Sequence, residues 1–129
     1  MDLFTKLRSM RLLLIDDDEW VRDSLRLFFE SEGCQIVALE TAEEGLNATM
    51  SRNFDLIIVD YRLPGMDGIE FIKHLPANQA GTLKVLITAY GSEDLFLKAK
   101  QSGFNEFIPK PFTTEIIEAS LNRLIGPTD

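Results

Sequence analysis

The sequence predicts an α/β fold in which helices cover both faces of a five-stranded parallel sheet. Short apolar runs that end abruptly in polar residues alternate with segments in which apolar residues recur at helical spacing, and this alternation occurs five times. Such runs are typical of buried parallel strands. Repeated strand–helix units favour a doubly wound sheet, because right-handed crossovers leave few other topologies.

Polar or turn-forming residues bound each apolar run and so define the strands. The run Leu12–Ile15 leads into Asp16, and the run Leu56–Val59 leads into Asp60. The fifth run is short and ends in a proline, which cannot donate a hydrogen bond to a neighbouring strand. The predicted strands, in order, are Arg11–Asp16, Gln35–Leu39, Asp55–Asp60, Lys84–Thr88 and Glu106–Pro109.

Helical spacing and end signals define the five helices that follow these strands. The first places Val21, Leu25 and Phe29 on one face and ends at Gly33, as helices with a C-terminal glycine do. The second opens with the capping box Thr41–Glu44, whose side chains satisfy free backbone N–H groups. The second helix ends near Arg52, and the other three are predicted from Ile69 to Leu75, from Ser92 to Ser102 and from Thr113 to Gly126–Pro127.

Length and composition indicate one domain with its own core. The chain has 129 residues, of which 45% are hydrophobic, and a net charge of −8. An acidic chain without a cluster of Lys and Arg is not expected to bind nucleic acid. No apolar stretch approaches the ~20 residues of a membrane span, and no signal-peptide pattern is present, so we expect a cytoplasmic location and no membrane contact.

Polar side chains lie where four of the predicted strands end. Asp16 and Asp17 follow the first strand, Asp60 the third, Thr88 the fourth and Lys110 the fifth. The carboxyl ends of parallel strands meet at one edge of a sheet, so these side chains form one candidate site. Clustered carboxylates repel one another unless a cation lies among them, and oxygen ligands suit a hard ion such as Mg²⁺. A carboxylate can also attack phosphorus, and Asp60, alone at its strand end, is the predicted nucleophile.

Four motifs, each closing a predicted strand, resemble the receiver domain of bacterial two-component response regulators. They are Leu14–Asp18, Val59–Gly68, Ile87–Tyr90 and Lys110–Phe112. The resemblance implies a flavodoxin-like sheet of order 2-1-3-4-5 with five helices. It implies a receiver domain over residues 10–125, which leaves residues 1–9 as an N-terminal extension of unknown role.

The resemblance also implies a function for the site. Asp60 would accept a phosphoryl group, and Asp16, Asp17, Asp60 and the backbone carbonyl of Arg62 would hold Mg²⁺ or Mn²⁺. The donor would be a sensor histidine kinase, a phosphotransfer protein or a small acyl phosphate. Phosphorylation would switch the surface of the domain for a downstream effector, so the chain is not expected to be an enzyme that turns over an external substrate.

The same resemblance implies a switch. Thr88 and Lys110 would contact the phosphoryl group, and the bond between Lys110 and Pro111 would be cis. Thr88 would act with an aromatic residue of the fifth strand, here Phe107, which lacks a tyrosine hydroxyl, so its switching would rest on packing alone. The face formed by the fourth predicted helix, the fifth strand and the fifth helix would be a docking or homodimer surface.

Several other residues have simpler interpretations. Arg62 and Tyr90 are bulky enough to shield a phosphoryl group from water. Cys34 heads an apolar run and is predicted to be a buried, inert thiol. Trp20 is predicted to be a partly exposed packing residue, and His74 a solvated side chain. The apolar residues Leu95–Leu97 cannot all face inward, so at least one is expected at the surface.

Two other functions are compatible with parts of the sequence. A phosphatase of the haloacid-dehalogenase type would use Asp16 and Asp18 as its Asp-x-Asp motif, but it would leave Asp60 and the loop Pro64–Gly68 without a role. A flavodoxin-like flavin binder would need a phosphate-cradling loop after the first strand, where three aspartates would repel phosphate. The sequence leaves open whether the receiver stands alone or is part of a longer regulator.

Overall fold

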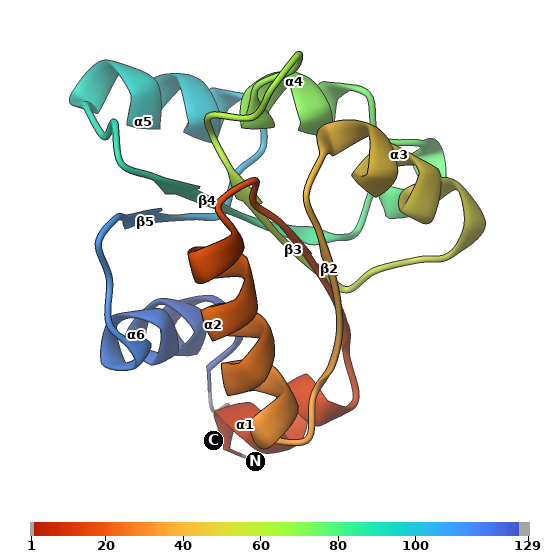
Figure 1. Ribbon diagram of the computed structural model, residues 1–129, viewed down its shortest axis with the longest axis vertical. Coiled ribbons are helices and arrows are strands. Elements are labelled where there is room, and N and C mark those ends of the chain that lie inside the picture. Colours follow the sequence, from red (N-terminus) through yellow and green to blue (C-terminus); the bar gives the residue numbers. More distant parts are fainter. Residues whose placement is uncertain (1, 127–129) are drawn as a thin grey trace.

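The computed structural model describes residues 2–126, and the predicted stop signal at Pro127 lies outside them. Five parallel strands form one sheet in the order β2-β1-β3-β4-β5 (Figure 1), which confirms the predicted order. The strands are β1 (Arg11–Ile15), β2 (Gln35–Leu39), β3 (Leu56–Asp60), β4 (Leu83–Thr88) and β5 (Glu106–Pro109). The helices are α1 (Leu3–Arg8), α2 (Glu19–Ser31), α3 (Ala42–Ser51), α4 (Gly68–Lys73), α5 (Glu93–Gln101) and α6 (Thr114–Ile125), with a 3₁₀ turn at Ala77–Gln79.

Alternate side chains of the central strands supply two separate cores. Leu12 and Leu14 point to the face covered by α1, α2 and α6, whereas Leu13 and Ile15 point to the face covered by α3, α4 and α5 (Figure 1). This alternation follows from the period of two along a strand. Because β1, β3 and β4 are buried on both sides, their sequences are continuous apolar runs.

Side-chain caps fix where the helices begin. Asp18, Asp67, Ser92 and Thr113 each accept a hydrogen bond from a backbone N–H in the first turn of the following helix. The predicted capping box of Thr41 and Glu44 is present at the start of α3. These caps satisfy N–H groups that have no partner within the helix. They therefore set the points at which the loops from the carboxyl edge of the sheet enter the helices.

The helix α1 is an addition to the five predicted helices. Asp2 caps it by accepting a hydrogen bond from the backbone N–H of Thr5, and Leu3 and Leu7 enter the core beside α2 and α6. Lys6 donates hydrogen bonds to the carbonyls of Ile125 and Gly126 at the end of α6. The segment that the sequence left without a role is thus packed into the domain. No helix among residues 2–126 has the length and apolar character needed to cross a bilayer.

Candidate functional site

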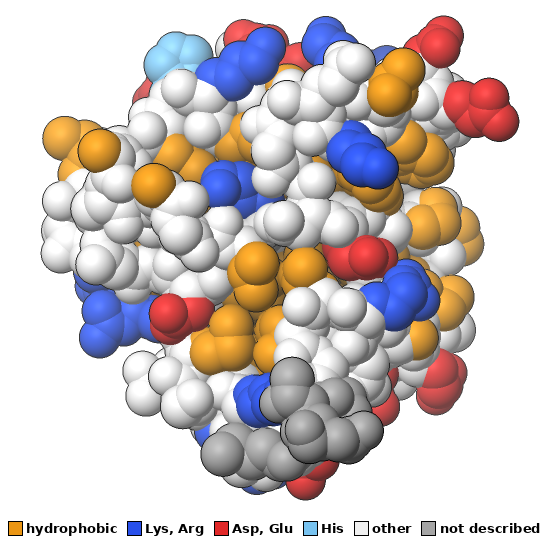
Figure 2. Space-filling view, turned by 180° about the vertical axis from the view of Figure 1, so that it is seen from behind, with side chains coloured by type: hydrophobic (Ala, Val, Ile, Leu, Met, Phe, Trp, Pro, Cys, Tyr) orange, Lys and Arg blue, Asp and Glu red, His pale blue; other side chains and the backbone are white. Residues whose placement is uncertain are grey.

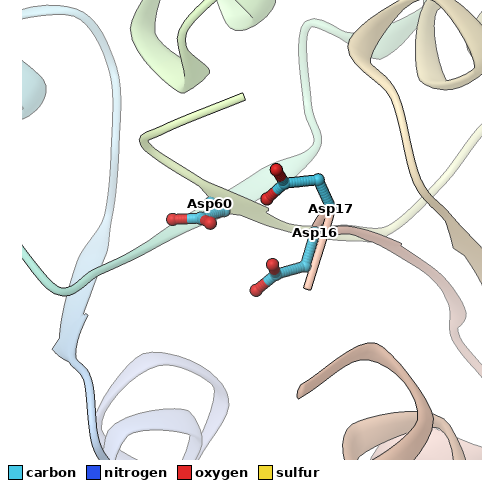
Figure 3. A group of neighbouring side chains, drawn as sticks. All are labelled: Asp16, Asp17 and Asp60. Carbon is cyan, nitrogen blue, oxygen red and sulfur yellow. The ribbon is translucent and has the colours of Figure 1, made fainter. Parts of the chain in front are cut away.

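Three carboxylates meet beyond the carboxyl ends of β1 and β3. Asp16, Asp17 and Asp60 each place one oxygen so that these oxygens all lie within 4.8 Å of one another. Figure 3 shows the three carboxylates turned to the same side of the two strand ends. Asp16 is fully buried, Asp60 is 5% exposed, and Asp17 is exposed. The structure thus brings together the three aspartates that the sequence singled out.

The backbone after β1 fixes how the neighbouring aspartates are used. Asp16 Oδ1 accepts a hydrogen bond from the backbone N–H of Asp18 at 2.9 Å, which turns the chain sharply after the strand. Asp18 itself caps α2, accepting from the N–H groups of Trp20 at 2.9 Å and Val21 at 3.3 Å. Asp18 therefore belongs to the helix, and Asp16 and Asp17 remain as the acidic pair of the site.

Lys110 brings a positive charge to the buried carboxylates. Its Nζ lies 2.9 Å from Asp16 Oδ2 and 3.1 Å from Asp60 Oδ2, and the hydrogen bond goes to Asp60. The backbone N–H of Lys110 donates to the carbonyl of Thr88 at 2.8 Å, which ties the end of β5 to the end of β4. The peptide bond between Lys110 and Pro111 is cis, as predicted.

Burial makes the charge of Asp60 unfavourable in the absence of a further cation. Removal from water, followed by the charge of Asp16, raises the pKa of Asp60 to about 6, and Lys110 only partly opposes this change. Burial alone would lower the pKa of Lys110, but the nearby carboxylates of Asp16 and Asp60 raise it. One lysine therefore does not neutralise three clustered carboxylates.

The donor set fits a hard divalent cation. All three side chains offer carboxylate oxygens, which are the ligands that Mg²⁺, Mn²⁺ and Ca²⁺ accept. The buried oxygen Asp16 Oδ2 has Lys110 as a charge partner but accepts no hydrogen bond from any residue between 2 and 126. An oxygen in this state can still bind a cation, so the residues present are suited to hold one.

The two predicted switch residues lie on the neighbouring strands. Thr88 is fully buried at the end of β4, and its hydroxyl oxygen accepts a hydrogen bond from the backbone N–H of Tyr90 at 2.9 Å. Phe107 lies half-buried on β5 and packs against Phe96 of α5, with ring centres 5.3 Å apart. Thr88 stands one position beyond Ile87, which is paired with Asp60 in the sheet.

Two surface features beside the site could not be read from the sequence. The guanidinium carbon of Arg62 lies 4.2 Å from the centre of the Tyr90 ring, so the two bulky residues contact each other. Trp20 is 82% exposed rather than a packing residue, because its position in the first turn of α2 points away from both cores. It lines a depression of about 510 Å³ with Phe112 and Lys110 among others.

Three simpler predictions are confirmed. Cys34 is buried, and Leu97 is the exposed member of its apolar run, at 57%. The single histidine, His74, is exposed, and a ring nitrogen lies 2.8 Å from the carbonyl oxygen of Glu70. Figure 2 shows it in pale blue at the edge of a face on which hydrophobic atoms gather near the centre, with charged side chains beside and around them.

Comparisons with known proteins point in one direction. Residues 12–122 match the protein family described as response regulator receiver domain. The transcriptional regulatory protein FixJ of Bradyrhizobium diazoefficiens is 32% identical over 114 residues, which are 88% of this chain and 56% of the relative. The transcriptional activator protein PfeR of Pseudomonas aeruginosa is 32% identical over 91% of this chain and 38% of the relative. The chain thus spans about half or less of the length of these two relatives.

Solved structures agree with the sequence matches. A response regulator from Burkholderia pseudomallei, solved with a phosphorylated aspartic acid, a calcium ion and citrate, has a TM-score of 0.80 at 27% identity, covering 87% of this chain and 66% of that chain. The beryllofluoride-activated NtrC4 receiver domain dimer, solved in solution, has a TM-score of 0.80 at 31% identity, covering 88% of this chain and 93% of that chain.

Proposed function

Because this chain belongs to the family of response regulator receiver domains, we propose that Asp60 is the residue that accepts the phosphoryl group. The observation that carries this proposal is the meeting of three carboxylates with Lys110. Asp16 is fully buried and out of reach of a donor, and Lys110 contacts Asp60 but has no ion pair with Asp17 among residues 2–126. Asp60 is the carboxylate that combines access with a neighbouring cation able to stabilise the transferred group.

Asp16 and Asp17 are proposed to hold Mg²⁺ or Mn²⁺, together with Asp60 and the backbone carbonyl of Arg62. The proximity of the three carboxylates and the unfilled capacity of Asp16 Oδ2 support this assignment. When bound, the ion neutralises negative charge on the transferring phosphoryl oxygens. The calcium ion in the Burkholderia pseudomallei structure indicates that a related protein accommodates a divalent ion.

The transfer itself needs few protein groups. An oxygen of Asp60 bonds to phosphorus while the bond between phosphorus and the donor breaks, and the donor keeps the electron pair. The donor is a phosphohistidine of a sensor kinase or phosphotransfer protein, or a small acyl phosphate. Lys110 contacts one phosphoryl oxygen, and the hydroxyl of Thr88 donates to another. Each domain takes up one group, so we do not propose turnover of an external substrate.

The response is proposed to reach the face formed by α5, β5 and α6. Thr88 is the last residue of β4 and Lys110 follows β5 directly, so drawing both toward Asp60 moves the connections to α5 and α6. Phe107, which packs on Phe96, is the second switch residue. A downstream effector, or a second copy of the domain, would bind this face, and the NtrC4 relative is described as a dimer. The receiver domain is proposed over residues 10–125, and the cytoplasmic location stays a prediction.

Intact mass measurement after incubation with acetyl phosphate and Mg²⁺ tests the assignment. The wild type should gain one phosphoryl group, and Asp60→Asn or an excess of chelator should abolish the gain. Asp23→Asn is a matched control, because it changes a surface carboxylate of α2. An adduct that persists in Asp60→Asn would show that Asp60 is not the acceptor. Steady hydrolysis of p-nitrophenyl phosphate would favour the phosphatase alternative.

A further inference from the structure

Arg22 reaches back from the first turn of α2 to the acidic pair. Its Nη1 donates a hydrogen bond of 2.8 Å to the backbone carbonyl oxygen of Asp16. Its own backbone N–H donates to the carbonyl of Asp18 at 2.9 Å, within the helix ladder. The residue therefore joins α2 to the short segment between β1 and the helix cap, which is the segment that carries Asp16 and Asp17.

The carbonyl of Asp16 needs this partner. Asp16 is fully buried, and Arg22 is the donor that residues 2–126 provide to its carbonyl oxygen. A buried carbonyl without a hydrogen bond is unfavourable, and the backbone rearranges where it can to avoid one. Replacing Arg22 by a residue without a donor should therefore release the peptide bond that follows Asp16.

The peptide bond between Asp16 and Asp17 links the two acids. Because a peptide bond is planar, holding its carbonyl oxygen fixes the orientation of the whole plane. Asp16 is held at two further points, since its N–H donates to the carbonyl of Leu39 at 3.1 Å and its Oδ1 accepts from the N–H of Asp18 at 2.9 Å. The carboxylate of Asp17 is exposed, yet it turns toward the other carboxylates of the site (Figure 3). Its direction therefore depends on the plane whose oxygen is bound from α2.

The contact of Arg22 orients the acids rather than neutralising them. The site carboxylates of Asp16 and Asp60 form ion pairs with Lys110, and within residues 2–126 they form none with Arg22. The hydrogen bond of Arg22 goes to a neutral carbonyl. Its positive charge would by itself repel a cation in the site, so any help it gives to metal binding must come from geometry.

From these observations we propose that Arg22 is a positioning residue for the metal site. By holding the peptide bond between Asp16 and Asp17, it keeps the carboxylate of Asp17 directed into the site and so raises the affinity for Mg²⁺. The inference rests on the proposed function of the three carboxylates and assigns a role to a side chain that hydrogen-bonds none of them. Losing a partner that orients metal ligands typically weakens metal binding about 10- to 100-fold.

The dependence of phosphorylation on Mg²⁺ concentration tests this role. In Arg22→Met, the Mg²⁺ concentration that gives half the maximal initial rate with acetyl phosphate should rise about tenfold, while the rate at saturating Mg²⁺ should match the wild type. Arg22→Lys keeps a donor and should recover most of the affinity. Arg26→Met is the matched control, because Arg26 lies one turn further along α2 and pairs with Asp23 and Glu30. It removes the same charge and should not weaken Mg²⁺ binding.

A spectroscopic signature in the metal-free domain reports on the contact itself. The nitrogen of Asp17 belongs to the same peptide bond as the carbonyl of Asp16, so its ¹⁵N chemical shift should respond when the hydrogen bond from Arg22 is lost. The shift should change in Arg22→Met, return toward the wild-type value in Arg22→Lys and stay unchanged in Arg26→Met. NMR titration of the same samples with Mg²⁺ gives the dissociation constants directly.

Several results would overturn the positioning role. They are unchanged Mg²⁺ affinity in Arg22→Met, equal weakening in Arg22→Met and Arg26→Met, and a lower rate at saturating Mg²⁺ without a change in affinity. Loss of the folded state of Arg22→Met in chelator, measured by circular dichroism, would also overturn it, because the contact would then support the whole domain. Failure of the wild type to form any adduct would instead overturn the proposed function, whereas the Mg²⁺ titrations would still test Arg22.

Discussion

At Asp60, burial in the fold disfavours the charged carboxylate, whereas the proposed role as phosphoryl acceptor requires it. Its carboxyl group lies at 5% exposure beside Asp16, and burial together with that neighbouring charge raises its pKa to about 6. Because this pKa is above the ordinary value of 3.8, the folded chain holds the proton more tightly than the unfolded chain does. The metal-free domain should thus lose stability as the pH rises from about 4 to about 6.

Asp60→Asn should remove this loss. Without divalent metal, the free energy of unfolding at pH 7.5 should rise by about 1–3 kcal/mol, because the buried charge is gone. The gain should shrink as the pH is lowered toward 5, where wild-type Asp60 is already largely protonated. Urea unfolding of both proteins in chelator at the two pH values measures the difference. A gain of equal size at both values would contradict the role of the Asp60 proton.

The two members of the acidic pair should respond differently to substitution. Asp17 is exposed, so Asp17→Ala should weaken Mg²⁺ binding and leave the metal-free melting temperature unchanged or higher. Asp16 accepts a hydrogen bond from Asp18 and contacts Lys110, so Asp16→Ala should cost about 1–3 kcal/mol even without metal. Thermal melts in chelator and Mg²⁺ titration followed by Trp20 fluorescence separate the two effects. A large metal-free destabilisation by Asp17→Ala would mean that this carboxylate is structural.

At the scale of elements, α1 shows how a short segment becomes part of the core. It has only six residues, too few to be a stable helix in isolation. Leu3 and Leu7 pack against α2 and α6, Phe4 meets Phe28 edge-to-face at 5.9 Å, and Lys6 caps the end of α6. Tertiary contacts therefore hold α1 in place, and α1 in turn closes the amino edge of the sheet.

Leu7→Ala should test the contribution of α1 to stability. Leu7 is fully buried, so truncating it should lower the free energy of unfolding by about 2–5 kcal/mol. Leu27→Ala changes an equally large side chain that is 59% exposed on α2, and it should shift stability by no more than about 0.5 kcal/mol. Urea unfolding of the two variants gives the comparison. Equal, small effects would show that α1 is not part of the cooperative unit.

Elements with a clear hydrophobic pattern could be predicted from the sequence. Features that depend on tertiary contacts with distant residues could not. The strands and the positions of Asp16, Asp60 and Lys110 follow from apolar runs that end in polar residues. The helix α1 has too few residues for its spacing to stand out. Gln79 looks like a loop residue but is buried, because its amide group bonds backbone groups of Thr49, Arg52 and Phe54.

The candidate site shows the same division. Strand ends identify which side chains converge, because topology alone brings them to one edge. They do not give the side-chain directions after the strands, so the contact between Arg62 and Tyr90 and the exposure of Trp20 had no sequence signal. Spacing along one chain cannot say which surface residues meet across two loops.

At the scale of the whole molecule, the site and the proposed response surface are joined by two strand ends. Thr88 and Lys110 are linked by a backbone hydrogen bond of 2.8 Å, so β4 and β5 would move together. A Cβ at Gly91, in the loop after β4, would lie 2.7 Å from the ring of Phe96, which in turn packs on Phe107. Displacement of this loop would therefore press directly on the aromatic pair. Under the proposed function, the active arrangement is a minor state before phosphorylation, and contacts with the phosphoryl group stabilise it.

Beryllofluoride, a mimic of the phosphoryl group, should reveal this path by NMR. In the wild type, chemical shifts should change in the loops of the site and also on α5, β5 and α6, including Phe96 and Phe107. In Thr88→Ala, the loops should still respond while the changes on α5 and β5 are strongly reduced. Equal propagation in both proteins would show that Thr88 does not transmit the response.

The contact between α1 and α6 makes the domain suitable for circular permutation. Lys6 bonds the carbonyl groups of Ile125 and Gly126, so the first and last described elements lie together at the amino edge of the sheet (Figure 1). The two ends of the chain between residues 2 and 126 are therefore close together. A short linker could join these two ends, and new termini could be introduced at an exposed turn such as Gly81. In such a circular permutant β4 would be the first strand of the chain, yet the three aspartates and Lys110 would still meet at the carboxyl edge of the sheet.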